Sequence, residues 1–207
     1  MPPTDIAPGL WIWRLPHPDW SADADWEPHV TSTVIETGGE VALIDPLAPP
    51  EDDAEIWERL DAAPPTLIVI LKPDHVRDVD LFIHWYGVRG YGPWLWEKGT
   101  APNEELQFVM PDDILPGGLV ALTDGRGGIE RPLYLPEQRA LVFADGMTAP
   151  GGQLRVWWTP VLERRALPAL RSMLELPFEH VLVSHGQPVH TRADFEAALE
   201  REPWSHP

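Results

Sequence analysis

Residues able to bind a divalent metal follow the ends of three strand-like segments of this sequence. The segments are Thr66–Ile70, Ala140–Phe143 and His180–Val183. The residues that follow them within a few positions are Asp74, His75, Asp145 and His185. Side chains at strand-to-loop junctions are held by a rigid scaffold while they face a cleft. Two carboxylates and two neutral imidazoles suit zinc first, and also iron(II) or manganese, so these residues predict a site for one divalent ion.

Each of these residues also has a purely structural explanation. Asp74 could be the N-cap of a helix that begins at Val76, because a carboxylate there accepts hydrogen bonds from free helical N–H groups. Asp145 and His185 each precede a glycine and could simply end a strand in a turn. All three junctions occurring in chain order by chance is less probable than any one of them, and this favours a shared site.

Short segments rich in Val, Ile, Leu, Thr or aromatic residues, and bounded by Gly, Pro or Asp, predict the strands. They are Leu10–Trp13, Thr31–Ile35, Val41–Ile44, Thr66–Leu71, Trp94–Trp96, Leu119–Leu122, Pro132–Leu135, Ala140–Phe143, Arg155–Trp158 and His180–Val183. Two glycines within Glu36–Glu40 predict a hairpin between two of these strands.

Apolar residues at helical spacing predict the helices. These cover Asp52–Leu60, Val76–Trp85, Leu167–Leu176 and Thr191–Glu200. Thr191 and Asp194 have the spacing of a capping box at the start of the last helix. Strands dominate the first part of the chain and alternate with helices later, which predicts a layered α/β protein with helices outside packed sheets. A length of 207 residues fits one domain spanning residues 1–207.

Composition excludes several classes of protein. The formal charge is -18, with no basic run, so a nucleic-acid partner is not expected. The chain has no cysteine, which excludes disulfides, thiolate nucleophiles and cysteine-bound zinc. Its first residues lack the basic and apolar regions of a signal peptide, and no apolar run reaches the about 20 residues that cross a bilayer. We therefore expect a cytoplasmic protein without a membrane partner.

The tryptophans have two interpretations. Trp11 and Trp13 alternate along one predicted strand, as do Trp94 and Trp96 along another, so each pair shares a sheet face. A bulky core between packed sheets is the first interpretation. An aromatic substrate pocket or a protein interface, where tryptophan is enriched, is the alternative.

Five segments in chain order resemble the metallo-β-lactamase superfamily, and its glyoxalase-II-like hydrolases especially, over most of the chain. They correspond to the early hairpin ending in an aspartate (here Asp45), the His-x-His-x-Asp-His motif, the Pro-Gly-His segment, the aspartate that bridges two metals, and the terminal His-Gly. In this sequence they are Thr31–Pro46, Thr66–Phe82, Gly118–Gly128, Leu141–Gly146 and Val181–Val189. The resemblance implies a four-layer αββα sandwich.

The resemblance also implies which ligands have changed. One metal of the family's pair is held by the first two histidines of the motif, the Pro-Gly-His histidine and the bridging aspartate. The three histidine positions here are Ile70, Lys72 and Arg126. The other metal is held by the motif's aspartate and last histidine, the bridging aspartate and the terminal histidine. Those positions are Asp74, His75, Asp145 and His185, so one half of a dinuclear site is lost and the other is kept.

Lys72 and Arg126 leave two outcomes open. In the first, one metal stays, and the two cations stabilise a substrate oxyanion in the vacated half. In the second, Lys72 pairs with Asp145 and Arg126 with Asp74, which closes the site without a metal. Unit charges about 4 Å apart attract by about 4 kcal/mol at an effective dielectric constant of about 20, before desolvation is counted.

The main functional hypothesis is a metal-dependent hydrolase of a small ester, thioester, amide or related carbonyl compound. The metal would lower the pKa of a water molecule, Asp74 or Asp145 would accept its proton, and Lys72 and Arg126 would stabilise the oxyanion. The alternative is an inactive member of the family that binds a partner without a metal. A third interpretation is a structural α/β protein in which these residues are unrelated.

Overall fold

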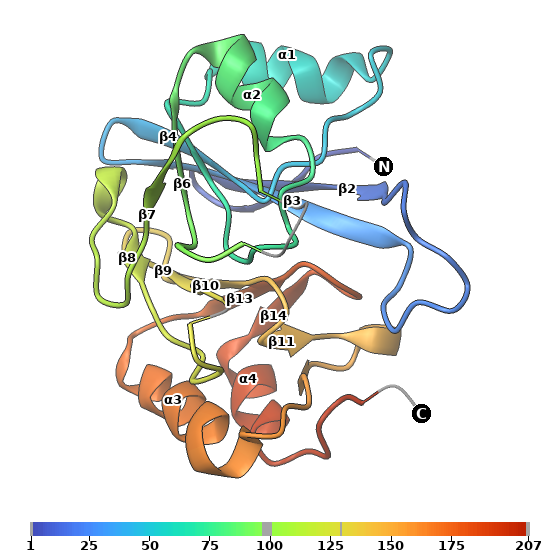
Figure 1. Cartoon of the computed structure of the whole chain (residues 1–207), viewed down its shortest axis with the longest axis vertical. Helices are drawn as coiled ribbons and strands as arrows, with labels where there is room; N and C mark the ends of the chain where they lie inside the picture. The colour runs from blue at the N-terminus through green and yellow to red at the C-terminus, as the bar shows by residue number, and fades with distance from the viewer. Residues whose placement is uncertain (1, 97–100, 129, 206–207) are drawn as a thin grey trace.

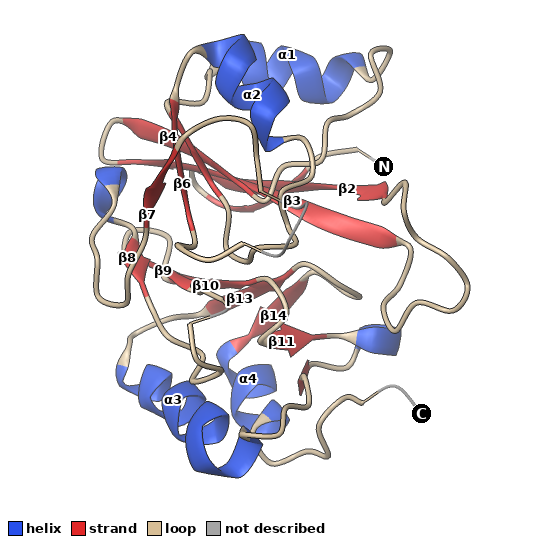
Figure 2. Ribbon diagram, in the orientation of Figure 1, coloured by secondary structure: helices blue, strands red, loops and turns tan. Residues whose placement is uncertain are grey.

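Four layers make up the computed structural model of the chain, which describes residues 2–96, 101–128 and 130–205. Two β-sheets face each other, and each carries two helices on its outer face (Figures 1 and 2). The helices of the two outer layers are α1 (Ala54–Ala62) with α2 (Val79–Tyr86), and α3 (Leu167–Ser172) with α4 (Arg192–Ala198). This arrangement confirms the predicted αββα sandwich.

The first sheet has seven strands in chain order. They are β1 (Thr4–Ala7), β2 (Leu10–Pro16), β3 (His29–Thr37), β4 (Glu40–Ile44), β5 (Leu67–Val69), β6 (Arg89–Gly92) and β7 (Leu106–Phe108). Strands β1 to β4 form an antiparallel meander, and β4 to β7 are parallel. The predicted hairpin between β3 and β4 is present.

The second sheet has five strands in the order β14-β13-β10-β9-β8. In chain order they are β8 (Val120–Ala121), β9 (Leu133–Leu135), β10 (Ala140–Phe143), β13 (His180–Val183) and β14 (Val189–Thr191). The short strands β11 (Met147–Thr148) and β12 (Arg155–Val156) form a separate pair. Single helical turns cover Pro116–Gly118, Pro150–Gly152, Leu162–Ala166 and Met173–Glu175. Strands β10 and β13 are parallel neighbours, so their carboxyl ends deliver residues to the same edge.

Three apolar clusters hold the layers together: one between the sheets and one under each pair of helices. Strand β2 contributes to two of them because its side chains alternate between faces. Leu10 and Ile12 enter the cluster between the sheets, whereas Trp11 and Trp13 enter the cluster beneath α1 and α2. The Trp11–Trp13 pair therefore shares a face as predicted, and that face packs on helices rather than on the other sheet.

Several predicted elements differ from the structure. Trp94–Trp96 is not a strand, and Trp94 is half exposed. Helix α2 starts at Val79 after Asp78, so Asp74 is not its N-cap; residues 71–78 instead form a series of turns. The capping box of Thr191 and Asp194 at α4 is confirmed.

Among the described residues, no helix combines the length and apolar character that crossing a bilayer requires.

Candidate metal centre

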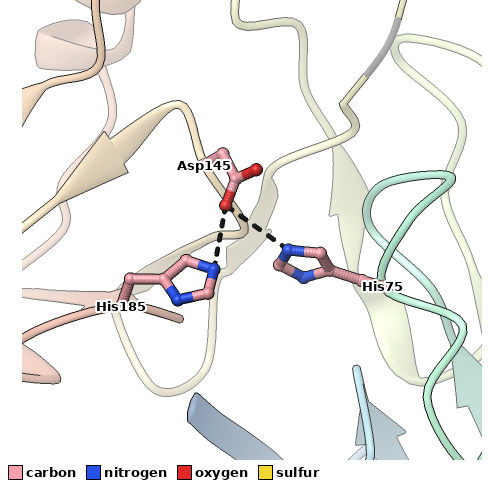
Figure 3. Close-up of side chains that lie close together, drawn as sticks. All are labelled: His75, Asp145 and His185. Atoms are coloured by element: carbon pink, nitrogen blue, oxygen red, sulfur yellow. Dashed lines mark ion pairs between the residues drawn. The ribbon is translucent and has the colours of Figure 1, made fainter. Parts of the chain in front are cut away.

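His75, Asp145 and His185 meet at the edge of the two sheets (Figure 3). They come from the turns after β5, the end of β10 and the end of β13. Oδ1 of Asp145 lies 3.4 Å from His75 Nε2 and 3.2 Å from His185 Nε2, so one carboxylate oxygen faces both imidazoles. Each imidazole is buried and the carboxylate is largely so. The structure therefore brings three of the four predicted ligands close together.

The turn that follows His185 depends on Gly186. Its φ is +81°, in the left-handed region that favours glycine. A Cβ atom at this position would lie 2.1 Å from the carbonyl oxygen of Ala149, which is far closer than any real contact. The backbone of Ala149 in turn donates a hydrogen bond to the His185 carbonyl at 3.1 Å. The close approach of these two segments fixes where the imidazole of His185 lies.

Asp45 orients His75 from behind. Its Oδ2 lies 2.8 Å from His75 Nδ1, and its Oδ1 accepts a hydrogen bond of 2.8 Å from the Leu71 backbone. A neutral histidine whose Nδ1–H donates to a carboxylate has an unprotonated Nε2 with a lone pair for a metal, which is how metal-binding histidines are usually held. Asp45 has a φ of +44°, a strained value for a residue other than glycine.

Burial and neighbouring charges shift the pKa values of the three residues in different directions. Burial alone would lower the pKa of His75, but the carboxylates of Asp45 and Asp145 outweigh it and raise that pKa to about 9. Burial lowers the pKa of His185, against the opposing influence of Asp145. Burial would raise the pKa of Asp145, yet His75 and Lys72 hold it well below its usual range. The carboxylate is therefore ionised, as a metal ligand must be, whereas His75 is protonated near neutral pH and would have to lose a proton to bind a metal.

The geometry of these residues fits one metal ion. Two ligands at about 2.0–2.1 Å from a tetrahedral ion lie about 3.3 Å from each other, which matches both donor separations at Asp145 Oδ1. This buried oxygen has no hydrogen-bond partner of normal geometry among the described residues, although both imidazoles lie within ion-pair distance of it. Three protein ligands with one position open is the arrangement of catalytic rather than structural zinc sites.

Asp74, the fourth predicted ligand, lies outside this group. Its carboxylate pairs with the ammonium of Lys72, and 43% of its side chain is exposed. Lys72 also lies 2.7 Å from Asp145 Oδ2, the oxygen that faces away from the imidazoles. Burial would lower the pKa of Lys72, but Asp145 and Asp74 raise it, so the ammonium stays charged. The Lys72–Asp145 pair is one of the two ion pairs expected for a closed site.

Arg126 does not pair with Asp74, and that part of the expectation is wrong. Its guanidinium pairs with Asp124 and Glu130 instead. Glu130 is fully buried and accepts backbone N–H groups from residues 144, 145 and 146 at 2.7–2.9 Å. Burial raises the pKa of Glu130 to about 7, yet its oxygens accept only N–H donors, which is the pattern of a charged carboxylate.

The side chains around Asp145 therefore form two groups. We call the group at Oδ1 the donor side; it consists of His75 and His185. We call the group at Oδ2 and behind the Asp145 backbone the ion-pair side; it consists of Lys72, Asp74, Arg126, Asp124 and Glu130. Sequence reasoning missed Asp124 and Glu130 because only the folded loop brings them to the ends of β9 and β10.

A pocket of about 400 Å³ opens over both sides. Apart from the residues already described, it is lined by His17, Asp25, Trp26, Val30, Arg77, Trp157 and Trp158. Arg77 has a φ of +45° and donates hydrogen bonds to the carbonyl groups of Thr31 and Asp45 at 2.8 and 2.6 Å. Trp26, Trp157 and Trp158 give part of the pocket an aromatic wall.

Known proteins resemble this chain in both sequence profile and fold. The profile of the metallo-beta-lactamase superfamily matches residues 26–161. A comparison with curated protein sequences gives no match.

Solved structures share the fold at low identity. FIM-1 from Pseudomonas aeruginosa, a metallo-beta-lactamase crystallised in its mono-zinc form, has a TM-score of 0.68 and 18% identity over 97% of this chain and 94% of its own. A metallo-beta-lactamase from Pontibacter korlensis has a TM-score of 0.69 and 17% identity over 97% and 99%. The profile match spans most of the sequence, and we conclude that the chain belongs to the metallo-beta-lactamase superfamily.

Proposed function

We propose that this protein is a hydrolase that uses one divalent metal, zinc in the first place, to cleave a small ester, thioester or related carbonyl substrate. The observation that carries the proposal is the position of Asp145 Oδ1. It is buried, lacks a hydrogen-bond partner among the described residues, and lies at tetrahedral-edge distances from two imidazole nitrogens. Membership of a superfamily named for its metal-dependent enzymes supports the same assignment.

The charge around the site suits a cation. Six carboxylates lie in this region: Asp25, Asp45, Asp74, Asp124, Glu130 and Asp145. Three cationic side chains accompany them: Lys72, Arg77 and Arg126. With His75 deprotonated on metal binding and His185 neutral, the region carries three negative charges, which one dication largely balances. We propose one ion rather than two because Ile70, Lys72 and Arg126 offer no ligands to a second.

A divalent ion held by the donor side would polarise a substrate carbonyl and activate a water molecule. Asp145 is a poor proton acceptor, because its pKa is held well below the usual range. Asp74 lines the pocket with 43% of its side chain exposed, and we assign proton acceptance to it. Lys72 supplies a fixed positive charge beside it for a substrate oxyanion.

Arg126 has a different part in this proposal. Two carboxylates already neutralise its guanidinium, so little of its charge is left for a substrate. We assign it to the support of the Asp145 backbone through Glu130.

FIM-1 was crystallised with a single zinc, and the same occupancy is proposed for this chain.

The ion-pair side supports a second candidate, an inactive protein that binds a small ligand or a partner without a metal. In that case Lys72 would hold Asp145 permanently, and its 2.7 Å contact is the observation in favour. The two candidates differ in whether the donor side binds a metal. The same experiment therefore separates them.

We expect chelated protein to take up one zinc per chain and to gain stability with it. At a free zinc concentration 100 times the dissociation constant, the gain in free energy of unfolding is about 2.7 kcal/mol. His185→Ala should abolish both effects, whereas His84→Ala, which changes an exposed histidine on α2, should change neither. Metal analysis measures the uptake and thermal unfolding the stability. Zinc-dependent hydrolysis of p-nitrophenyl acetate, which His185→Ala should also lose, measures the activity. Zinc uptake that is equal in His185→Ala would refute the proposed centre.

A further inference from the structure

We propose that the pocket contains a subsite for an aromatic ring, formed by Trp26 and Trp157 beside His185, and that the subsite takes neutral or cationic rings in preference to anionic ones. This inference deepens the proposed function, because it names the group that the substrate carries next to the reacting bond. The subsite itself is a feature of the tryptophans and does not require a metal.

Trp26 and Trp157 flank the imidazole of His185. Their ring centroids lie 4.9 Å and 6.0 Å from it, with the Trp157 ring edge-on. Both tryptophans line the pocket and are partly buried rather than lost in a core. His17 packs edge-on against Trp26, with centroids 5.3 Å apart, and extends the aromatic surface. A planar group that enters the pocket can therefore pack against indole rings within reach of the donor side.

The C-terminal tail fixes both tryptophans in place. Trp204 donates its indole N–H to the carbonyl of Asp25 at 3.1 Å, next to Trp26 in the β2–β3 connection. Its backbone pairs in parallel with Trp157, through hydrogen bonds of 2.8 Å to the Val156 carbonyl and 2.7 Å from the Trp158 N–H. Figure 1 shows the β2–β3 connection and the tail on the same side of the molecule. Trp204 is thus a positioning residue for the whole subsite.

The β2–β3 connection is also held by its own contacts and by a neighbouring turn. Trp20 donates its indole N–H to the carbonyl of Trp26 at 2.8 Å. Glu27 accepts the backbone N–H of Gly151 at 2.9 Å. Together with the bond from Trp204 to Asp25, they fix the chain on both sides of Trp26, whose ring packs against His185. A rigid aromatic surface of this kind loses little conformational entropy when a ligand binds.

The charge of the pocket selects against anions. Each cationic side chain that lines it is already engaged: Lys72 and Arg126 with two carboxylates each, and Arg77 with two carbonyl groups. Asp25 and Asp74 add negative charge to the lining. The whole chain carries a formal charge of -18, which repels anions at a distance. A cation beside an indole face gains an attraction that an anion lacks.

The test measures binding of three small probes by NMR titration, with chelated and with zinc-loaded protein. Benzyltrimethylammonium should bind most tightly, benzyl alcohol less tightly and phenylacetate least. Trp26→Ala and Trp157→Ala should each weaken benzyltrimethylammonium by about five- to tenfold. Trp26→Phe, which keeps a ring, should recover most of the loss. Trp85→Ala, on the exposed outer side of α2, should bind as the unchanged protein does.

Trp204→Phe tests whether Trp204 positions the two tryptophans of the subsite. It keeps an aromatic side chain but removes the N–H that the Asp25 carbonyl accepts, so it should weaken benzyltrimethylammonium about threefold, roughly the effect of one lost hydrogen bond. Phenylacetate that binds chelated protein as tightly as benzyltrimethylammonium does, or binding that neither Trp26→Ala nor Trp157→Ala changes, would overturn the subsite. Because chelated protein is measured as well, a protein that hydrolyses nothing could still confirm the subsite.

Discussion

The two sides of Asp145 present the same carboxylate to opposite environments. At Oδ1, the donor side offers two imidazole nitrogens and no hydrogen bond among the described residues. At Oδ2, the ion-pair side supplies an ammonium at 2.7 Å, and Glu130 accepts the backbone N–H of Asp145 at 2.8 Å. The donor side carries a positive charge only when His75 is protonated or a metal is bound, whereas the ion-pair side has fixed positive charges of its own.

This difference supports our proposal that the site is a two-metal framework reduced to one metal. The positions that correspond to the family's histidines carry Lys72 and Arg126, and each cation meets carboxylates that neutralise it. In this proposal a fixed ammonium takes the place of a dication at the second oxygen of Asp145. Buried charges that are paired and hydrogen-bonded are tolerated, whereas an unpaired one is not.

The largest effect is expected from breaking the ion-pair side at its centre. Glu130→Ala removes a buried carboxylate, takes away one of the two carboxylate partners of Arg126 and leaves three backbone N–H groups without partners. We expect a loss of about 3–5 kcal/mol in the free energy of unfolding, measured by urea denaturation.

The matched control is Glu179→Ala, which removes a carboxylate paired with Arg139 where both side chains are about half exposed. Exposed pairs of this kind contribute about 0–1 kcal/mol. A Glu130→Ala protein as stable as this control would show that the ion-pair side does not support the fold.

An intermediate effect is expected on the donor side from Asp45→Asn. The substitution keeps the size of the side chain but weakens the hydrogen bond that holds His75 with Nε2 toward Asp145. The zinc dissociation constant should rise by about 10–100-fold, since residues behind a ligand commonly contribute this much. Competition with a chromophoric chelator measures it. Asp52→Asn, on the exposed surface before α1, is the control, and equal affinities in the two variants would contradict the assignment.

The smallest effect is expected from Lys72→Met, which removes the ammonium of the ion-pair side from Asp145 Oδ2. A metal at the donor side would then no longer be repelled, and zinc affinity should rise by about tenfold. The stoichiometry should stay at one, because Ile70 and Arg126 still offer no ligands to a second ion. Calorimetric titration reports both numbers. A lower affinity would mean that Lys72 helps to hold the metal ligands in place.

Local patterns were sufficient to predict the donor side. Asp145 and His185 follow strands β10 and β13, whose apolar runs are unmistakable and whose parallel pairing brings their ends together. His75 follows β5 in the same way. The prediction failed at Asp74 because residues 71–78 form turns rather than a helix start, and those turns direct His75 inward while Asp74 reaches Lys72.

The ion-pair side and the aromatic subsite could not be predicted in this way. Glu130 meets residues 144–146 only because an irregular loop folds back between β8 and β9. Trp204 reaches Asp25 across almost the whole length of the chain. Strands β6 and β7 were missed because "RGYG" and "LQF" are too short and too mixed to show a period. Contacts between distant irregular segments leave no periodic trace in a sequence.

A substitution at Gly186 would disrupt the candidate metal centre without removing any of its ligands. Any side chain there would collide with the Ala149 backbone, so the loops after β11 and β13 would have to separate. The imidazole of His185 would move with its loop, away from Asp145 and from both flanking indoles. Gly186→Ala would therefore keep all three ligands in the sequence but prevent them from meeting, and the protein would no longer bind a metal at this centre.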